Sequence, residues 1–308
     1  MTAMPTDEVL ATLRMLQGLD LPAHGGRTLA YVYDSGLADA DAVGLEALAM
    51  FAGSNGLDPT AFPSLLKMEN DLVALAGGLL DAPDGFAGSV TSGGTESILL
   101  AVLAARKGSD HPSPSMVLPT SAHAAFHKAA AYLGVRAVLV DVDPVTLRAD
   151  PAAMAAAVDD STVLVVASAP SYAHGVIDPV PEIAALAAAR GIRCHVDACI
   201  GGWVLPHLDT ATPWTFAVEG VTSVSVDLHK YAYTPKGVSV LLHRTAALRS
   251  THLFASANWP GYTMLNATMQ STRSGGPLAA AWAVTRRIGL DGYAELARRA
   301  REAPPAIA

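Results

Sequence analysis

Short apolar runs alternate along most of the chain with alanine-rich segments of helical spacing. The apolar runs are rich in β-branched residues, and Thr162–Ala167 is apolar or β-branched throughout, as expected of a strand buried on both faces of a parallel sheet. The alternation predicts βαβ units around a mostly parallel sheet. The expected strands are Ser115–Pro119, Val135–Val140, Thr162–Ala167, Arg193–Val196, Thr222–Val226 and Ser239–His243.

Helices are expected between these strands, and Gly191 follows one of them as a left-handed C-cap. Residues 1–80 differ from the rest, with an early helix at Asp7–Gln17 and two further helical patterns, and are expected to form an N-terminal arm. We expect residues 81–290 to form the main α/β domain and residues 291–308 a connecting helix (Gly292–Arg301) with a frayed tail. The expected helices of the main domain are Thr95–Lys107, Ala122–Leu133, Pro151–Val158, Val180–Arg190 and Pro277–Ile288.

Composition narrows the class of protein. The chain of 308 residues has a net charge of −8, which argues against a nucleic-acid binder, and its 51% hydrophobic content is typical of a folded core. It contains no apolar run of the roughly 20 residues that a membrane span needs, and its acidic start lacks the features of a signal peptide. Two cysteines and scattered histidines predict neither a disulfide framework nor a metal site. We therefore expect a cytoplasmic enzyme without a membrane span.

A glycine-containing motif, Thr91-Ser-Gly-Gly-Thr-Glu-Ser97, stands directly before a helical segment. Paired glycines let the backbone approach a ligand closely, and a helix N-terminus offers free N–H groups to a phosphate. The motif lacks the lysine of a P-loop and the spacing of a dinucleotide fingerprint. It predicts either a phosphate cradle or an ordinary helix cap.

The next helix is expected to begin with Ser121 as its N-cap and His123 in its first turn. This position lies at the C-terminal edge of the predicted sheet, where open α/β folds bind ligands. In isolation, such a histidine is more often a packing or surface residue than a functional one.

Two charged residues stand at the ends of expected strands. Asp197 ends an apolar run, and a carboxylate buried there must be paired to remain ionised, although many such residues cap the next helix. Lys230 follows another run and precedes aromatic residues. Burial in such surroundings lowers the pKa of a lysine and makes it a usable nucleophile, although most lysines are solvated. Together the four features form the parts of a pyridoxal 5′-phosphate site: phosphate anchor, ring stack, acid partner and Schiff-base lysine.

These motifs resemble those of the group II pyridoxal-phosphate-dependent decarboxylase family, and most closely its sphingosine-1-phosphate lyase branch. The resemblance covers the chain from about Gly26 to Arg301 and implies a fold type I, transferase-like α/β domain. Members of this family carry a small C-terminal domain, which we expect to be missing from this chain. The motifs on which the resemblance rests are Thr91–Ser97, Ala122–Phe126, Val196–Cys199, Asp227–Tyr231, Pro235–Gly237, Phe62–Ser64, Lys67–Glu69 and Thr272–Gly276.

The resemblance also implies roles for individual residues. Lys230 is expected to form the Schiff base, Asp197 to pair with the pyridine nitrogen, and His123 to stack on the cofactor ring. The protein is expected to be a homodimer. The residues expected to hold the cofactor phosphate are Gly93, Gly94, Thr95 and His229. Tyr31 or Tyr33 and Lys236 are expected to face the substrate. The segment Ser271–Gly276, which includes Thr272 and Arg273, is expected to reach the partner's cofactor.

One departure concerns the substrate. The lyases of this family commonly read Asn-Pro-Leu-His where this chain reads Asn55-Gly-Leu-Asp58. A carboxylate in place of that histidine has the wrong sign to bind a substrate phosphate.

The expected function is a carbon–carbon lyase that acts on a small-molecule amine through Lys230. The reaction is either retro-aldol cleavage of a 2-amino-3-hydroxy compound or decarboxylation of an amino acid. One alternative is an inactive remnant or a partner-dependent cofactor-binding protein, because loss of the small domain would expose apolar surface. Another is a class V aminotransferase or desulfurase, although Cys199 lies beside Asp197 and not in a catalytic loop.

Overall fold

The computed structural model describes the backbone of residues 2–28 and 30–307 and the side chains of these ranges up to residue 303. A seven-stranded sheet has the order β1-β7-β6-β5-β4-β2-β3. Neighbouring strands from β6 to β3 are parallel, and β7 is antiparallel to both β1 and β6. The strands are β1 Ala87–Thr91, β2 Ser115–Pro119, β3 Arg136–Val140, β4 Thr162–Ser168, β5 Arg193–Asp197, β6 Ser223–Asp227 and β7 Ser239–His243.

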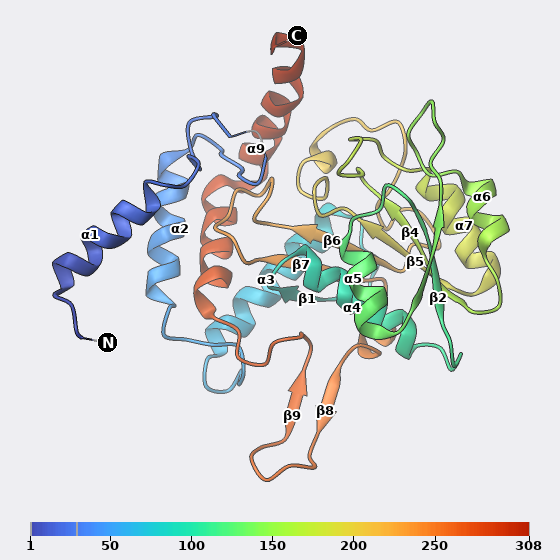
Figure 1. Cartoon of the computed structure of the whole chain (residues 1–308), viewed down its shortest axis with the longest axis horizontal. Helices are drawn as coiled ribbons and strands as arrows, with labels where there is room; N and C mark the ends of the chain where they lie inside the picture. The colour runs from blue at the N-terminus through green and yellow to red at the C-terminus, as the bar shows by residue number, and fades with distance from the viewer. Residues whose placement is uncertain (1, 29, 308) are drawn as a thin grey trace.

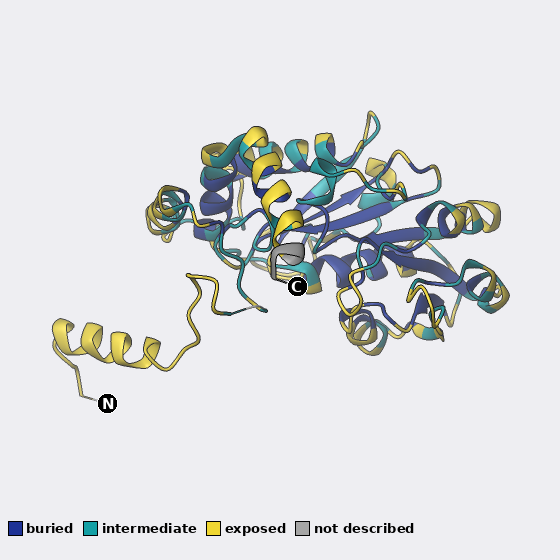
Figure 2. Cartoon of the chain, turned by 90° about the horizontal axis from the view of Figure 1, so that it is seen from above, coloured by how far each residue is buried: buried dark blue, intermediate teal, exposed yellow. Residues whose placement is uncertain are grey.

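Helices cover both faces of this sheet (Figures 1 and 2). Along β4, Leu164 and Val166 belong to the core beneath α4 and α5, whereas Val165 and Ala167 belong to the core beneath α3, α6 and α7. This two-residue alternation is the side-chain period of a strand, and here both faces are apolar because both are covered. The helices are α1 Thr6–Gln17, α2 Ala38–Met50, α3 Pro63–Leu79, α4 Gly94–Lys107, α5 Ala125–Leu133, α6 Pro151–Ala157, α7 Val180–Arg190, η1 Leu205–His207, α8 Ala246–Ser250 and α9 Gly275–Ile307.

The predicted mostly parallel sheet is confirmed, and so is the left-handed cap at Gly191 (φ 64°). Strand β1 was not expected, because its sequence Ala-Gly-Ser-Val-Thr has no apolar run. A short hairpin of β8 (Phe254–Ser256) and β9 (Met264–Asn266) was also not expected, and its residues are largely exposed.

The expected start of α5 is wrong. Ala122 N donates to Pro119 O and forms a turn first, so that Ala124 becomes the N-cap and the helix begins at Ala125. Ser121 Oγ is buried and makes no hydrogen bond with the described part of the chain. His123 thus precedes the helix and does not lie in its first turn.

Helix α9 consists of two helical parts that meet at Gly289, whose φ of 67° and ψ of 169° break the helix. A positive φ of this size favours glycine. The second part continues to Ile307, where a frayed tail was expected, because a helix that has formed is extended at little cost.

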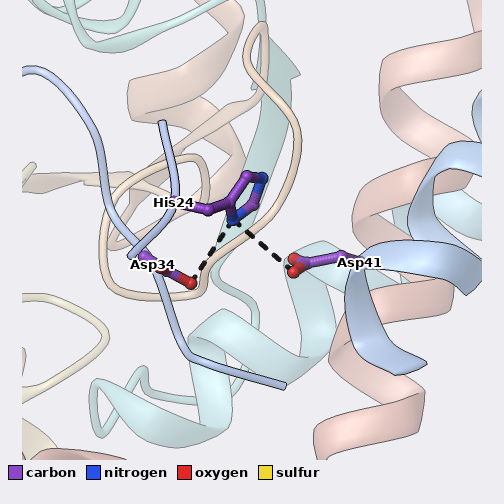
Figure 3. A group of neighbouring side chains, drawn as sticks. All are labelled: His24, Asp34 and Asp41. Carbon is purple, nitrogen blue, oxygen red and sulfur yellow. Dashed lines mark ion pairs between the residues drawn. The ribbon is translucent and has the colours of Figure 1, made fainter. Parts of the chain in front are cut away.

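The N-terminal residues divide into a packed and an unpacked part. Helix α2 runs beside α9, whereas α1 has no buried residue and projects from the body (Figures 1 and 2). The loop before α2 is tied to it through His24, whose Nδ1 lies 3.4 Å from Asp34 Oδ1 and 3.7 Å from Asp41 Oδ2 (Figure 3). None of the described helices combines the length and the apolar character that crossing a membrane requires.

Candidate active site

A cavity of about 380 Å³ lies where the carboxyl ends of β2, β4, β5 and β6 meet the N-terminus of α4. Loops that follow parallel strands emerge at one edge of the sheet, which is where open α/β folds bind ligands. The structure brings together here all residues expected to hold the cofactor. They are Gly93, Gly94, Thr95, His123, Asp197, His229 and Lys230.

The N-terminus of α4 forms one wall of the cavity. Gly93 is its N-cap and has a φ of 154°, which side-chain-bearing residues rarely adopt. A Cβ on Gly94 would lie 2.8 Å from both carboxylate oxygens of Asp227 and 2.8 Å from Cys199 Sγ. The first turn of α4 therefore approaches the ends of β5 and β6 so closely that a side chain at Gly94 would force its neighbours to shift, and this turn lines the cavity.

Asp197 ends β5 and is buried, with 8% of its surface exposed. Its Oδ1 accepts a hydrogen bond from Cys199 N at 3.0 Å and one from Ser225 Oγ at 3.4 Å. These contacts fix the carboxylate at the strand end and stabilise its negative charge. It remains directed at the cavity, which it lines.

Lys230 follows β6 by one turn and contacts the aspartate that ends this strand. Lys230 Nζ lies 3.0 Å from Asp227 Oδ2, and His229 Nε2 lies 3.6 Å from the same oxygen. Asp227 is 3% exposed, and its other oxygen, Oδ1, is buried without a hydrogen-bond partner in the described part of the chain. The lysine therefore enters the cavity as one half of a buried ion pair.

The expected lowering of the Lys230 pKa is wrong. Burial is the largest single influence and acts to lower it, but the charge and hydrogen bond of Asp227, together with Cys199 and Asp197, outweigh burial, and the pKa of Lys230 is raised above its usual value. Burial lowers the pKa of His229, and the neighbouring lysines Lys236 and Lys230 add to this although Asp227 opposes it. At neutral pH the cavity thus holds a protonated lysine next to a neutral histidine.

His123 lines the cavity from the loop after β2. Its Nδ1 accepts a hydrogen bond at 3.1 Å from the backbone N–H of Ala125, the first residue of α5. This bond holds the ring at the cavity mouth, where its side chain is exposed.

Two of the three expected substrate residues come together next to the cavity. Lys236 Nζ lies 4.9 Å from the centre of the Tyr33 ring, and the rings of Tyr33 and Tyr231 pack edge to face at 5.2 Å. Burial raises the pKa of Tyr33, although the charge on Lys230 opposes this. Tyr31 is 80% exposed, and none of the three expected substrate residues lines the cavity itself.

The segment expected to reach a partner lies by a second, larger cavity of about 1020 Å³. Arg273 contacts its own chain there: Nη2 lies 3.1 Å from Glu69 Oε2, and Nη1 donates to Val90 O. Thr272 is exposed. Asp58 also lines this cavity, and hydrogen bonds from the side chain and backbone of Thr60 lower its pKa, so it is negatively charged at neutral pH.

Sequence reasoning missed Asp227 as a site residue. The signal was present, because Asp227 ends a buried strand in the same way as Asp197. Tyr172 and Pro170, which follow β4 and line the cavity, carry no comparable signal because nothing in their surroundings marks them as functional.

Residues 29–304 match the pyridoxal-dependent decarboxylase conserved domain. The chain is 44% identical over 263 residues to a sphingosine-1-phosphate lyase of Dictyostelium discoideum, and this match covers 83% of this chain and 50% of the relative. It is 39% identical over 306 residues to sphingosine-1-phosphate lyase 1 of Rattus norvegicus, and this match covers 96% of this chain and 53% of the relative. The chain thus spans about half the length of these curated relatives.

The structure is also similar to a solved sphingosine-1-phosphate lyase from Burkholderia pseudomallei, with a TM-score of 0.91 and 36% sequence identity. The match covers 96% of this chain and 72% of that one. Sequence and structure agree, and the chain belongs to the pyridoxal-dependent decarboxylase family.

Proposed function

We propose that this protein is a pyridoxal 5′-phosphate-dependent lyase that breaks a carbon–carbon bond in a substrate with an amino group. The observation that carries the proposal is the convergence of Lys230, Asp197 and the α4 N-terminus on one cavity, although they lie far apart in the sequence. Membership in the family supports the cofactor.

The residues present fit this cofactor. A cavity of about 380 Å³ is of the size that small-molecule sites have. Gly93, Gly94 and Thr95 bring the N-terminus of α4 into the cavity wall, and a helix N-terminus is suited to bind an anion such as a phosphate. Lys230 supplies the amine and Asp197 a fixed carboxylate, which are the partners of an aldehyde and of a protonated ring nitrogen.

Each residue then has one role in holding the cofactor. Lys230 would attach to its aldehyde, Asp197 would pair with its ring nitrogen, and His123 would lie on its ring face. The backbone of Gly93, Gly94 and Thr95 would bind the phosphate together with His229. When bound, the cofactor supplies an electron sink for the pair of electrons left by the broken bond. Asp197 would strengthen that sink by keeping the ring nitrogen protonated.

Lys230 is also suited to move protons in the cavity. Its Nζ lies 3.0 Å from Asp227 Oδ2, which holds it in place as a cation when it is not covalently bound. A positioned ammonium can deliver a proton to a reacting group and recover it later.

The relatives named sphingosine-1-phosphate lyases favour retro-aldol cleavage of a 2-amino-3-hydroxy substrate. Asp58 affects whether the substrate can carry a phosphate group. Its negative charge lies in the wall of the larger cavity, where it would repel a phosphate that approached from this side. We therefore propose a 2-amino-3-hydroxy substrate without assigning it a phosphate.

The alternatives lack support. A desulfurase needs a reactive thiol, but burial and the charges of Asp197 and Asp227 raise the pKa of Cys199 well above its ordinary value. An inert remnant is disfavoured because the cavity retains every residue expected to hold the cofactor.

The proposal is tested by incubating the cofactor-loaded protein separately with sphingosine, sphingosine 1-phosphate and a panel of amino acids. We expect a long-chain aldehyde from a 2-amino-3-hydroxy compound, and none with Lys230→Ala. Carbon dioxide from an amino acid without any aldehyde would indicate a decarboxylase instead. Neither product from a fully loaded protein would contradict the lyase function.

We also propose a homodimer. Helix α1 supports it, because Leu13 and Leu16 are 56% and 49% exposed, and such apolar side chains on a projecting helix favour association. If Arg273 serves the partner's site, mixing Lys230→Ala with Arg273→Ala should restore about a quarter of the wild-type activity, since half the dimers then contain one intact site. Mixtures without activity would place Arg273 in its own subunit's site.

A further inference from the structure

Asp227 is the one carboxylate within ion-pairing distance of Lys230 in the described part of the chain, and neither the family resemblance nor the roles proposed above account for it. Its Oδ2 lies 3.0 Å from Lys230 Nζ, and both side chains are largely buried, at 3% and 18% exposed. Separating a buried carboxylate from its buried ammonium leaves an uncompensated charge and is strongly unfavourable, whereas a surface ion pair separates at little cost.

The position of Asp227 is fixed from two sides. It ends β6, which is buried along its whole length, and its carboxylate lies against the first turn of α4 at Gly94. The positive end of a helix dipole stabilises a negative charge in this place. Asp227 is therefore not free to turn away from Lys230.

Other groups around Lys230 do not take over this contact. Asp197 contributes charge from β5, but its Oδ1 accepts hydrogen bonds from Cys199 N and Ser225 Oγ. Because their pKa values are shifted, His229 and Cys199 are uncharged at neutral pH. Of the groups on the substrate side, burial raises the pKa of Tyr33, which is uncharged at neutral pH, and Lys236 cannot supply a negative charge in either protonation state.

We propose that Asp227 is the positioning residue that holds Lys230 Nζ in the cavity as an ammonium and sets the pH at which the free amine becomes available. The part that Asp227 plays in the reaction rests on the proposed function. An ammonium has no free electron pair, so Lys230 must lose a proton before its nitrogen can attack an aldehyde and release water. Asp227 thus delays attachment while it aims the nitrogen at the site.

The experiment measures the amine itself and needs no cofactor. The full chain is treated with formaldehyde and sodium cyanoborohydride between about pH 7 and pH 11, the range in which lysines titrate. The free amine condenses with formaldehyde and releases water, and cyanoborohydride then delivers hydride to the carbon of the imine. Mass spectrometry follows methylation of Lys230, with Lys128, which is exposed on α5, as the internal reference.

In the wild type we expect the reaction of Lys230 to reach half its maximum at a higher pH than that of Lys128. In Asp227→Asn, at a fixed pH below this midpoint, Lys230 should react at least tenfold faster, which corresponds to about one pH unit. Lys128 should be unchanged, and Asp227→Glu, which keeps the charge, should retain a high midpoint for Lys230. A merely structural role of Asp227 would change the reactivity of Lys230 without this dependence on charge.

Equal midpoints for Lys230 in the wild type and a folded Asp227→Asn variant would overturn the proposal. If that variant does not fold, the wild-type profile decides, and a Lys230 midpoint at or below that of Lys128 would contradict the account. Because pyridoxal 5′-phosphate is absent, failure of the protein to bind that cofactor would leave this result unaffected. The two proposals can therefore fail separately.

Discussion

Asp197 and Asp227 end two adjacent parallel strands, β5 and β6, and both line the cavity that holds Lys230. One carboxylate is fixed by a backbone N–H and a serine hydroxyl, and the other by the lysine. Two negative charges at this sheet edge repel each other, and the Lys230 ammonium beside Asp227 offsets that repulsion. In the function we propose, one of these carboxylates would pair with the cofactor ring and the other would hold the lysine that binds the cofactor.

The first prediction concerns the close approach at Gly94. Gly94→Ala would bring a Cβ to 2.8 Å from both oxygens of Asp227, so α4 or Asp227 must move. We expect a loss of about 1–3 kcal/mol in the free energy of unfolding, as for other overpacked sites. We also expect a weaker affinity for pyridoxal 5′-phosphate, measured by fluorescence titration.

Gly78→Ala is the matched control, because Gly78 is an exposed residue of α3 and an added Cβ there would meet no atom within 4 Å. It should leave cofactor affinity unchanged and stabilise the helix by about 0.5–1 kcal/mol. Equal cofactor affinity in both variants would show that the approach of α4 does not matter for binding.

The second prediction concerns the cysteines. Burial raises the pKa of Cys194 to about 12 and also raises that of Cys199, so neither thiol forms the reactive thiolate at neutral pH. The folded protein should not react with Ellman's reagent within minutes at about pH 8, a range in which an ordinary thiol is partly ionised. Both thiols should react after unfolding. Rapid labelling of Cys199 in the folded protein would reopen the desulfurase alternative.

The third prediction concerns stability in mild acid. Burial lowers the pKa of His195 and of His252 from 6.5 to about 4, and the charge of Arg249 adds to the effect on His252. Between these pH values the unfolded chain binds protons that the folded chain does not. The free energy of unfolding should therefore fall as the pH falls from about 6.5 towards 4, by about 2 kcal/mol per histidine at pH 5.

Urea denaturation at about pH 7 and pH 5 measures this loss. His252→Phe keeps an aromatic ring in the buried site and removes one titrating group, so the variant should lose less stability between the two pH values than the wild type. An equal loss in both proteins would mean that His252 does not contribute.

Most of the sheet could be predicted from the sequence, because buried strands such as β4 are apolar on both faces and leave an unmistakable run. Strand β1 could not, since its small residues are held by pairing with β7 and not by their own hydrophobicity. The start of α5 was also missed, because a turn closed by Ala122 N takes precedence over the capping preference of Ser121.

The candidate site likewise has features that the sequence predicts and features that only the fold determines. Residue types and their order predicted that Lys230 and Asp197 share one cavity, because both follow parallel strands. The charge state of Lys230 could not be predicted, since it depends on a side chain that the fold places at 3.0 Å. Which of the two neighbouring tyrosines packs beside the cavity likewise depends on loop conformation, since Tyr31 is exposed whereas Tyr33 packs against Tyr231.

The central claim is that Lys230 binds pyridoxal 5′-phosphate covalently in the cavity between α4 and the sheet edge. The most direct test is to add the cofactor, record the visible spectrum, reduce with borohydride and identify the modified peptide by mass spectrometry, with Lys230→Ala alongside. We predict a yellow protein whose cofactor becomes fixed to Lys230, and a variant that gains no covalent label. A wild-type protein that stays colourless, or a label on another lysine, would contradict the account.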